Sequence, residues 1–337
     1  MGKQSSLNGS RLYCPIQTYK DELFFSLVDY RNSRFTSNNP DKIIDFYDSF
    51  KNRDDLIEWM KERPRGAANI YEVEGDKEII VVIPTADFNG KYAKECRENI
   101  FKGLHMIFVE SGGREDFYFN YAHNCNTGIR KAMAYNPKWV VLSNDDMIKK
   151  DDVMVLEAEL RSNDPKKFKA LFAQPSKQHS SPAFIGRKRL FITDLALLLY
   201  YGVRYRSYYR YRLEGRRKWF FFSKETPISR IITKDIKKFF MTMDFIILSG
   251  KWCASEIEKH QNLLDETYIN SHEDTDLSLR LSVNTADYMF IQYRIDGVGG
   301  GSFDPSHDRE IMKRRNLTAI ANKIYFDRRV DEILGFK

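Results

Sequence analysis

The sequence predicts an α/β protein with a mostly parallel central sheet. Three apolar runs of four or five residues, rich in β-branched side chains, alternate with segments of helical length. Such runs, bounded by polar residues or glycine, are typical of strands buried on both faces. Their order and spacing favour parallel strands joined by right-handed crossovers. The expected strands are 79–83, 106–109 and 139–142, and the expected helices are 91–102 and 129–135.

The second half of the chain continues this alternation. Leu277 and Leu281, four residues apart, predict a helix with one buried face, and Asp151 or Asp152 could cap a helix that runs to residue 160. Glycines make 296–302 a loop. The other expected elements are strands at 170–173, 239–248 and 288–295, a helix at 251–261 and a helical tail from 308.

The chain divides into an N-terminal extension (1–76), a main domain (77–302) and a C-terminal helical tail (303–337). The extension shows helical spacing at 41–46 and 54–61, with a Pro-Arg-Gly sequence closing the second helix. We expect it to pack against the main domain or to contact an acceptor.

Composition limits the possible settings of the protein. The 337 residues include four scattered cysteines with no CxxC spacing, which argues against a zinc site or a disulfide framework and favours a reducing cytoplasm. No apolar run approaches the roughly 18 residues that span a bilayer, and the N-terminus lacks the apolar core of a signal peptide.

Positive charge is concentrated in one aromatic segment, which we term the basic aromatic insertion (187–238). It holds 15 Lys or Arg and 4 Asp or Glu, whereas the whole chain carries a net charge of +7. An anionic membrane surface, with cations on lipid phosphates and aromatics at headgroup depth, is one candidate partner. A partly buried hairpin without a ligand is the other main interpretation, and a nucleic acid stacked on tyrosines is less favoured.

The stretch 139–147 holds the principal candidate site. Its apolar run ends in Ser143 and Asn144, followed by Asp145 and Asp146. Ligands of α/β sheets bind beyond the carboxyl ends of strands, and two acids placed there can hold a divalent cation against a diphosphate. A turn is the alternative, because Asn and Asp often cap their own backbone.

Three further segments have both a functional and a structural interpretation. Glycines at 112 and 113, after the second strand, allow close approach of a ligand. Residues 126–128 are expected to open a helix whose free N–H groups could face an anion. Ser271 and Asp274 fit a capping box at a helix start.

Taken in chain order, the motifs between residues 77 and 302 resemble those of family-2 glycosyltransferases of the GT-A fold, with rhamnosyltransferase-like features. These enzymes invert the anomeric centre, depend on a metal and use nucleotide-sugar donors. The opening strand ends in Pro84-Thr85, and the second strand in the motif 108–113, which usually has Asp where Glu110 stands. The segment 126–132 is similar to the helix before the metal motif, 144–146 resembles the DxD motif, and 264–266 with 272–280 resembles the catalytic-base motif.

The resemblance implies a role for each matching residue. Asp145 and Asp146 would hold Mn²⁺ or Mg²⁺, with Asp146 as the direct ligand and Asp145 toward the ribose or sugar, and Asp274 would be the catalytic base. Many relatives carry a metal-binding His after the last strand, where this chain has 294–297 (RIDG), so Asp296 or His307 becomes the candidate. The implied donor-binding residues are Pro84, Thr85, Asp87, Glu110, Gly112, Asn126, Asn144 and Asp145, and the secondary or acceptor residues are Glu273, Asp296 and His307.

The sequence therefore predicts a cytoplasmic, peripherally membrane-associated inverting glycosyltransferase. Its donor would be of the UDP, GDP or dTDP type, and its acceptor a lipid-linked or polysaccharide glycan. A sugar-phosphate nucleotidyltransferase is an alternative, although 84–91 (PTADFNGK) lacks a Gly-rich phosphate loop. A non-catalytic module that binds membrane or nucleic acid is the third possibility.

Overall fold

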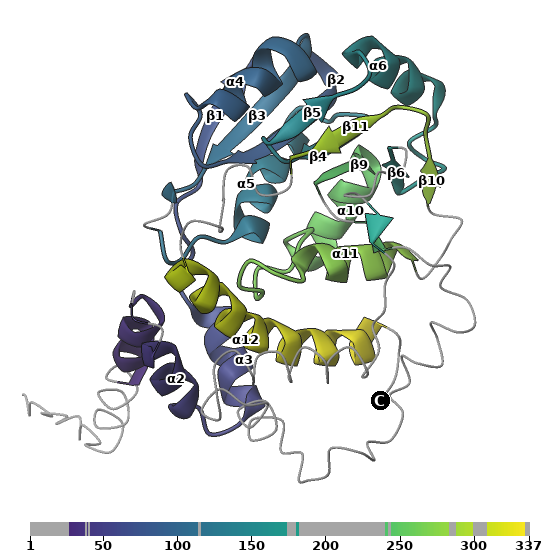
Figure 1. Ribbon diagram of the computed structural model, residues 1–337. Helices are drawn as coiled ribbons and strands as arrows, with labels where there is room; N and C mark the ends of the chain where they lie inside the picture. The colour runs from purple at the N-terminus through teal and green to yellow at the C-terminus, as the bar shows by residue number, and fades with distance from the viewer. Residues whose placement is uncertain are drawn as a thin grey trace, which may run out of the picture.

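A seven-stranded mixed sheet forms the centre of the molecule (Figure 1), which confirms the predicted α/β class. The computed structural model describes residues 27–37, 39, 41–113, 116–173, 180–181, 240–241, 244–282, 288–298 and 309–333. In order across the sheet, the strands are β1 (Asn69–Val73), β3 (Leu104–Glu110), β2 (Asp76–Thr85), β4 (Trp139–Ser143), β9 (Phe245–Ser249), β6 (Ala170–Phe172) and β10 (Tyr288–Phe290).

The three central strands β3, β2 and β4 run parallel, as predicted. β1, which falls within the predicted extension, adds an antiparallel edge to β3. β9 lies antiparallel between β4 and β6, and β6 pairs in parallel with β10. The carboxyl ends of β2, β3 and β4 therefore meet at one edge of the sheet.

Helices cover both faces of this sheet. Along β2, Ile79 and Val81 face one apolar layer, whereas Ile80 and Val82 face the other, which explains why the strand reads as a continuous apolar run. The first layer holds α4 (Lys91–Glu95), the π-helical turn η1 (Cys96–Ile100) and α6 (Val153–Ser162). The second holds α5 (Tyr121–Met133), α10 (Gly250–His260) and α11 (Glu273–Ser282).

The predicted start of α5 is wrong. The helix begins at Tyr121, because the side chain of Asn120 accepts a hydrogen bond from the His123 N–H and caps it. Gly128 lies inside the helix, where an added Cβ would overlap a Val82 methyl and lie 2.9 Å from Val109 Cγ2. Glycine is required for close packing of helix on sheet, and Asn126 and Gly128 offer no helix terminus to an anion.

Two predicted strands are each divided. The 239–248 segment contains β8 (Phe240–Met241), paired with β7 (Ser180–Ser181), and then β9. The 288–295 segment contains β10 and the first residue of β11 (Ile295–Gly297), which pairs with β5 (Met147–Lys149) in a separate ribbon. Asp296 and Gly297 therefore lie in a strand and not in the predicted loop. The predicted helices at 152–160, 251–261, 277–281 and the tail are present, and Asp152 caps the first of them.

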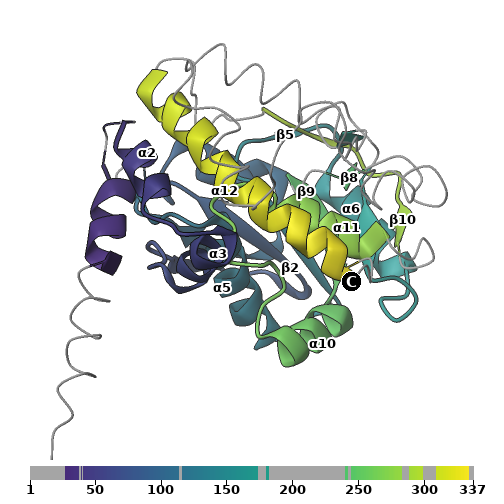
Figure 2. The ribbon, with the colours of Figure 1, turned by 90° about the horizontal axis from the view of Figure 1, so that it is seen from below.

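A third layer combines both ends of the described chain. The helices α2 (Asp41–Asp48) and α3 (Arg53–Glu62) of the extension pack with α12 (Arg309–Ile333) of the tail. In Figure 2, which views the molecule from below, α12 lies across the molecule beside α3 and α11. Their shared apolar cluster also includes Tyr268, Ile269 and Leu279, so this layer supports the segment that leads into α11.

One polar cluster joins β1 to the rest of the sheet. Glu72 lies 2.9 Å from Lys131 Nζ, accepts a 2.7 Å hydrogen bond from the Tyr135 hydroxyl and lies 3.1 Å from His105 Nε2. Burial opposes ionisation of Glu72, but the hydrogen bonds from Lys131, Tyr135 and His105 outweigh it and hold the pKa of this carboxyl at about 2.

The described residues test only one of the two predictions about membranes. Within those residues, no helix is both long enough and apolar enough to cross a bilayer. The basic aromatic insertion (187–238) lies outside the described residues, so its anionic partner stays a prediction.

Candidate active site

The predicted donor-side residues lie at the carboxyl ends of β2, β3 and β4. Thr85 and Glu110 are register partners at the ends of β2 and β3. The Thr85 hydroxyl donates a 2.7 Å hydrogen bond to Asp145 Oδ2, just beyond β4, and both residues are about 5% exposed. The Asp145 carboxylate thus contacts a neighbouring strand end, which a simple turn would not require.

Glu110 closes the loop that follows β2. Its Oε2 accepts a 2.8 Å hydrogen bond from the Phe88 N–H, and the Asp87 N–H lies 3.3 Å from the Thr85 hydroxyl oxygen. Asp87 itself is exposed and accepts from the Asn89 N–H at 2.8 Å. Pro84 is buried in β2 beyond the last residue paired with β4, where its missing N–H removes no ladder bond to that strand.

The backbone of the acid pair is fixed from two sides. The carbonyl of Asp145 accepts a hydrogen bond from Cys96 Sγ of η1 at 3.3 Å. The carbonyl of Asp146 accepts one from the Val298 N–H, just after β11, at 2.8 Å. Both aspartates are buried, so their carboxylates have little freedom to reorient.

The two carboxylates suit a hard divalent cation, but the described residues would supply only part of its coordination. Carboxylate oxygens are the preferred ligands of Mg²⁺ and similar ions. No group of three or more His, Cys, Asp or Glu side chains that could hold a metal occurs among the described residues. Among the described residues, Asp145 and Asp146 would therefore hold Mn²⁺ or Mg²⁺ together with oxygens of a diphosphate or water.

Of the two candidate additional metal ligands, only one lies in the described part of the chain. Asp296 pairs with Ile148 across the ribbon, and its carboxylate lies 3.4 Å from Lys150 Nζ. It forms an ion pair and does not join the acid pair in a group of metal-ligating side chains. His307 lies outside the described residues.

Asn144 is held by residues that the sequence did not point to. Its Oδ1 accepts a 2.8 Å hydrogen bond from the Tyr121 hydroxyl. Its Nδ2 lies 3.2 Å from Asp244 Oδ1, and its backbone N–H donates to the Asp244 carbonyl at 2.8 Å. Tyr121 and Asp244 are 23 and 100 residues away in the chain, and neither belongs to a recognisable motif.

The predicted base lies at the start of α11, without the predicted capping box. Within residues 271–275, Ser271 Oγ contacts His272 Nδ1 at 2.7 Å, and Asp274 Oδ1 accepts from the Thr275 N–H at 2.6 Å. Asn270 and His272 take positive φ angles of 51° and 76°, a conformation that turns the chain before the helix and is unusual for residues other than glycine. Burial raises the pKa of the Asp274 carboxyl above its ordinary value.

The tail helix, α12, holds this strained turn through side-chain hydrogen bonds. The Asn322 side chain accepts from the Ile269 N–H at 2.6 Å and donates to the Ile269 carbonyl at 2.8 Å. On α11, the fully buried Asp276 accepts hydrogen bonds from Tyr268, Arg280 and Arg329. These contacts hold the backbone on both sides of Asp274.

The donor side and the base side meet at Tyr121. The Tyr121 backbone N–H donates a 2.9 Å hydrogen bond to Asn270 Oδ1, while its hydroxyl bonds to Asn144. Burial, followed by the neighbouring Cys125 and the charges of Asp244 and Glu273, raises the pKa of the Tyr121 hydroxyl well above its usual range. The first turn of α5 therefore connects the acid pair with the segment that carries Glu273 and Asp274.

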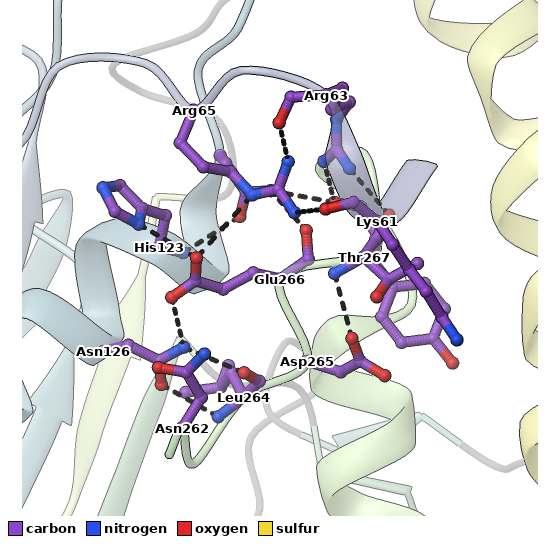
Figure 3. A network of polar contacts seen from close by, with 12 residues as sticks. Lys61, Arg63, Arg65, His123, Asn126, Asn262, Leu264, Asp265, Glu266 and Thr267 are labelled. Atoms are coloured by element: carbon purple, nitrogen blue, oxygen red, sulfur yellow. Dashed lines mark hydrogen bonds and ion pairs between the residues drawn. The ribbon is translucent and has the colours of Figure 1, made fainter. Parts of the chain in front are cut away.

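Asn126, a predicted donor-binding residue, has a structural role. It is buried, accepts from the N–H groups of Leu263 and Leu264, and donates to Glu266 Oε1 at 3.0 Å. Figure 3 shows Glu266 between Asn126, His123 and Arg65, with His123 Nδ1 at 3.0 Å and Arg65 Nε at 3.6 Å from its carboxylate. This network fixes the loop between α10 and the turn before α11.

The glycines after β3 also serve the local backbone. Gly113 has a φ of 71°, which favours glycine, and a Cβ at Gly112 would lie 2.8 Å from Asp116 Cβ. The close approach at Gly112 is therefore made by Asp116, which also accepts from the Ala67 N–H at 2.8 Å.

Comparison of the chain with protein-family models and with curated proteins found no match in either case.

Proposed function

We propose that this protein is an inverting, GT-A-type glycosyltransferase that uses a nucleoside-diphosphate sugar as donor. The observation that carries the proposal is the 2.7 Å hydrogen bond between Thr85 and Asp145 at the ends of parallel strands. It holds a buried carboxylate at the edge where α/β proteins bind nucleotides. The turn before α11 is linked to the same edge through Tyr121 and leads into the proposed base, Asp274.

On the donor side, Asp146 would be the direct ligand of the cation at the diphosphate and Asp145 would lie toward the ribose or sugar. Thr85 and Glu110 would contact the nucleobase or ribose. A divalent cation bound by the two aspartates would neutralise charge on the departing diphosphate. The buried backbone of the acid pair, held by Cys96 and Val298, supports this role because ordered carboxylates lose little freedom on binding.

On the acceptor side, Asp274 would take the proton of the acceptor hydroxyl as its oxygen attacks the anomeric carbon. The new glycosidic bond forms while the bond to the diphosphate oxygen breaks, and the nucleoside diphosphate leaves with the electron pair. Burial raises the pKa of Asp274, which makes its carboxylate a stronger base.

The acceptor is proposed to be a lipid-linked or polysaccharide glycan at the cytoplasmic face of an anionic membrane. Only the composition of the basic aromatic insertion supports this part. Replacing Arg204, Arg206, Arg210 and Arg212 by Gln should abolish co-sedimentation with phosphatidylserine vesicles. It should not abolish binding of a donor analogue, which occupies a different site. Unchanged sedimentation would exclude the membrane surface as the partner of these arginines.

Thermal unfolding with UDP, GDP and dTDP, each with and without Mn²⁺ or Mg²⁺, tests the donor site. Ligand at 100 times its Kd stabilises the folded state by about 2.7 kcal/mol, so one nucleotide should raise the Tm in a metal-dependent manner. Asp146→Asn should abolish this shift, whereas Asp164→Asn, in an exposed turn, should keep it. A wild-type protein that responds to none of the nucleotides would refute the donor site.

Donor turnover separates the base from the donor site. With nucleotide-sugars that carry the nucleotide identified by the unfolding assay, wild-type protein should release the nucleoside diphosphate, by transfer or slow hydrolysis. Asp274→Asn should retain the metal-dependent Tm shift and lose the release. Full release by Asp274→Asn would remove Asp274 from the role of base.

A further inference from the structure

Tyr121 touches both halves of the candidate active site. Its hydroxyl bonds to Asn144, the residue directly before the acid pair, at 2.8 Å. Its backbone N–H bonds to Asn270, three residues before Glu273, at 2.9 Å. We propose that Tyr121 is a positioning residue that couples the donor-side segment (143–147) to the base segment (268–275). The catalytic consequence rests on the proposed function, whereas the coupling itself does not.

On the donor side, Tyr121 controls the orientation of Asn144. The Asn144 amide lies between two partners, with its oxygen bonded to Tyr121 and its nitrogen 3.2 Å from Asp244. Because the amide plane is fixed from both ends, the backbone that leads into Asp145 has one defined direction. Loss of the hydroxyl would leave the carbonyl end of this amide without its tyrosine partner.

On the base side, the N-terminus of α5 is an anchor for the base segment. Asn270 bridges it, accepting from the Tyr121 N–H and donating to the Phe119 carbonyl at 2.7 Å. Asn120, the capping residue, donates to the carbonyls of Glu266 and Tyr268 at 2.9 and 3.1 Å. A shift of the first turn of α5 would therefore move the strained turn at 270–272 together with it.

Both connections use the same residue, so a disturbance at either end should reach the other. Coupling between two sites is reciprocal. Tyr121→Phe, which removes only the hydroxyl, should loosen the base segment as well as the donor segment. Asn270→Ala, which removes the contact with the helix start, should loosen the donor segment as well as its own turn.

Hydrogen exchange followed by mass spectrometry tests this coupling without any ligand. In Tyr121→Phe, peptides that cover 143–147 and 268–275 should both exchange several-fold faster than in the wild-type protein. The matched control is Tyr135→Phe, because the Tyr135 hydroxyl donates a 2.7 Å hydrogen bond to Glu72 of β1. Unchanged exchange of the base segment in Tyr121→Phe, or an equal increase in Tyr135→Phe, would overturn the proposal.

Nucleotide affinity tests the catalytic consequence. One neutral hydrogen bond is worth about 1 kcal/mol, or about five-fold in affinity. Tyr121→Phe and Asn270→Ala should each weaken binding of the metal–nucleotide by about this factor, and the double variant by less than the product of the two. Fully multiplicative effects would contradict the coupling. If the wild-type protein binds no nucleotide but the exchange result holds, the proposed function fails and the coupling stands.

Discussion

The hydrogen bond between Thr85 and Asp145 offers the sharpest test of the site geometry. Thr85→Val keeps the shape of the side chain and removes its hydroxyl, which lies 2.7 Å from Asp145 Oδ2 in a buried setting. A hydrogen bond to a charged group contributes about 1.5–3 kcal/mol. With about 2 cal/mol/K of unfolding entropy per residue, a chain of this size should lose about 2–4 °C in Tm.

The assay is thermal unfolding followed by circular dichroism, applied to a double-mutant cycle. In the Asp145→Asn background the hydroxyl contacts a neutral amide oxygen, so Thr85→Val should cost only about half as much. Thr85→Ser retains the hydroxyl and should lose less than Thr85→Val. If Thr85→Val lowers the Tm equally with and without the Asp145 carboxylate, the contact does not hold the acid pair in place.

Three further predictions concern packing and ionisation. Gly128→Ala gains about 1 kcal/mol of helix propensity, but overlap with two valines of the sheet should cost more, so the Tm should fall in the absence of any nucleotide; a rise would show that α5 stands off the sheet. Glu72 has a depressed pKa of about 2 against an ordinary 4.5. Glu72→Gln should therefore lose its full amount of stability above about pH 4.5, and this loss should vanish as the pH falls toward 2. A loss of stability that is independent of pH, measured in urea titrations, would contradict the ion network. Asp274 has a raised pKa, so its ionised form costs stability at neutral pH. Asp274→Asn should therefore raise the Tm at pH 7 but not at a pH below 3.8, the ordinary pKa of an aspartate. A lower Tm at pH 7 would mean that the carboxylate stabilises the turn.

The central sheet was predictable because strands buried on both faces carry their own signal. The runs that became β2, β3 and β4 are apolar on every residue, so no register had to be known to find them. The acid pair at Asp145 and Asp146 followed from its place after the third run, whereas Thr85 and Glu110 were named because the resemblance to family-2 glycosyltransferases implied them.

The errors arose where specific side-chain contacts, and not hydrophobic periodicity, decide the local structure. The start of α5 depends on the Asn120 cap, and the position of Gly128 on Val82 and Val109 of the sheet. The capping box at Ser271 gives way because His272 takes a positive φ and meets the Ser271 hydroxyl. None of these partners follows from local periodicity.

The same reason explains what was missed at the site. Asp244 and Asn270 contact Asn144 and Tyr121 across 100 and 149 residues of chain. A tyrosine in the first turn of a helix has no sequence signature for such a role. Only the assembled fold brings the two segments to one residue.

The position of α12 in the chain has a consequence for protein synthesis. Asn322 and Arg329 hold the turn and the helix around Asp274, yet α12 follows every other described element and leaves the ribosome last. Domains generally fold from the N-terminus during synthesis. A stalled nascent chain that ends before residue 309 is therefore expected to form β2, β3 and β4 while the segment around Asp274 is still unanchored. If the protein is the glycosyltransferase proposed above, sugar transfer would begin only after α12 has been synthesised.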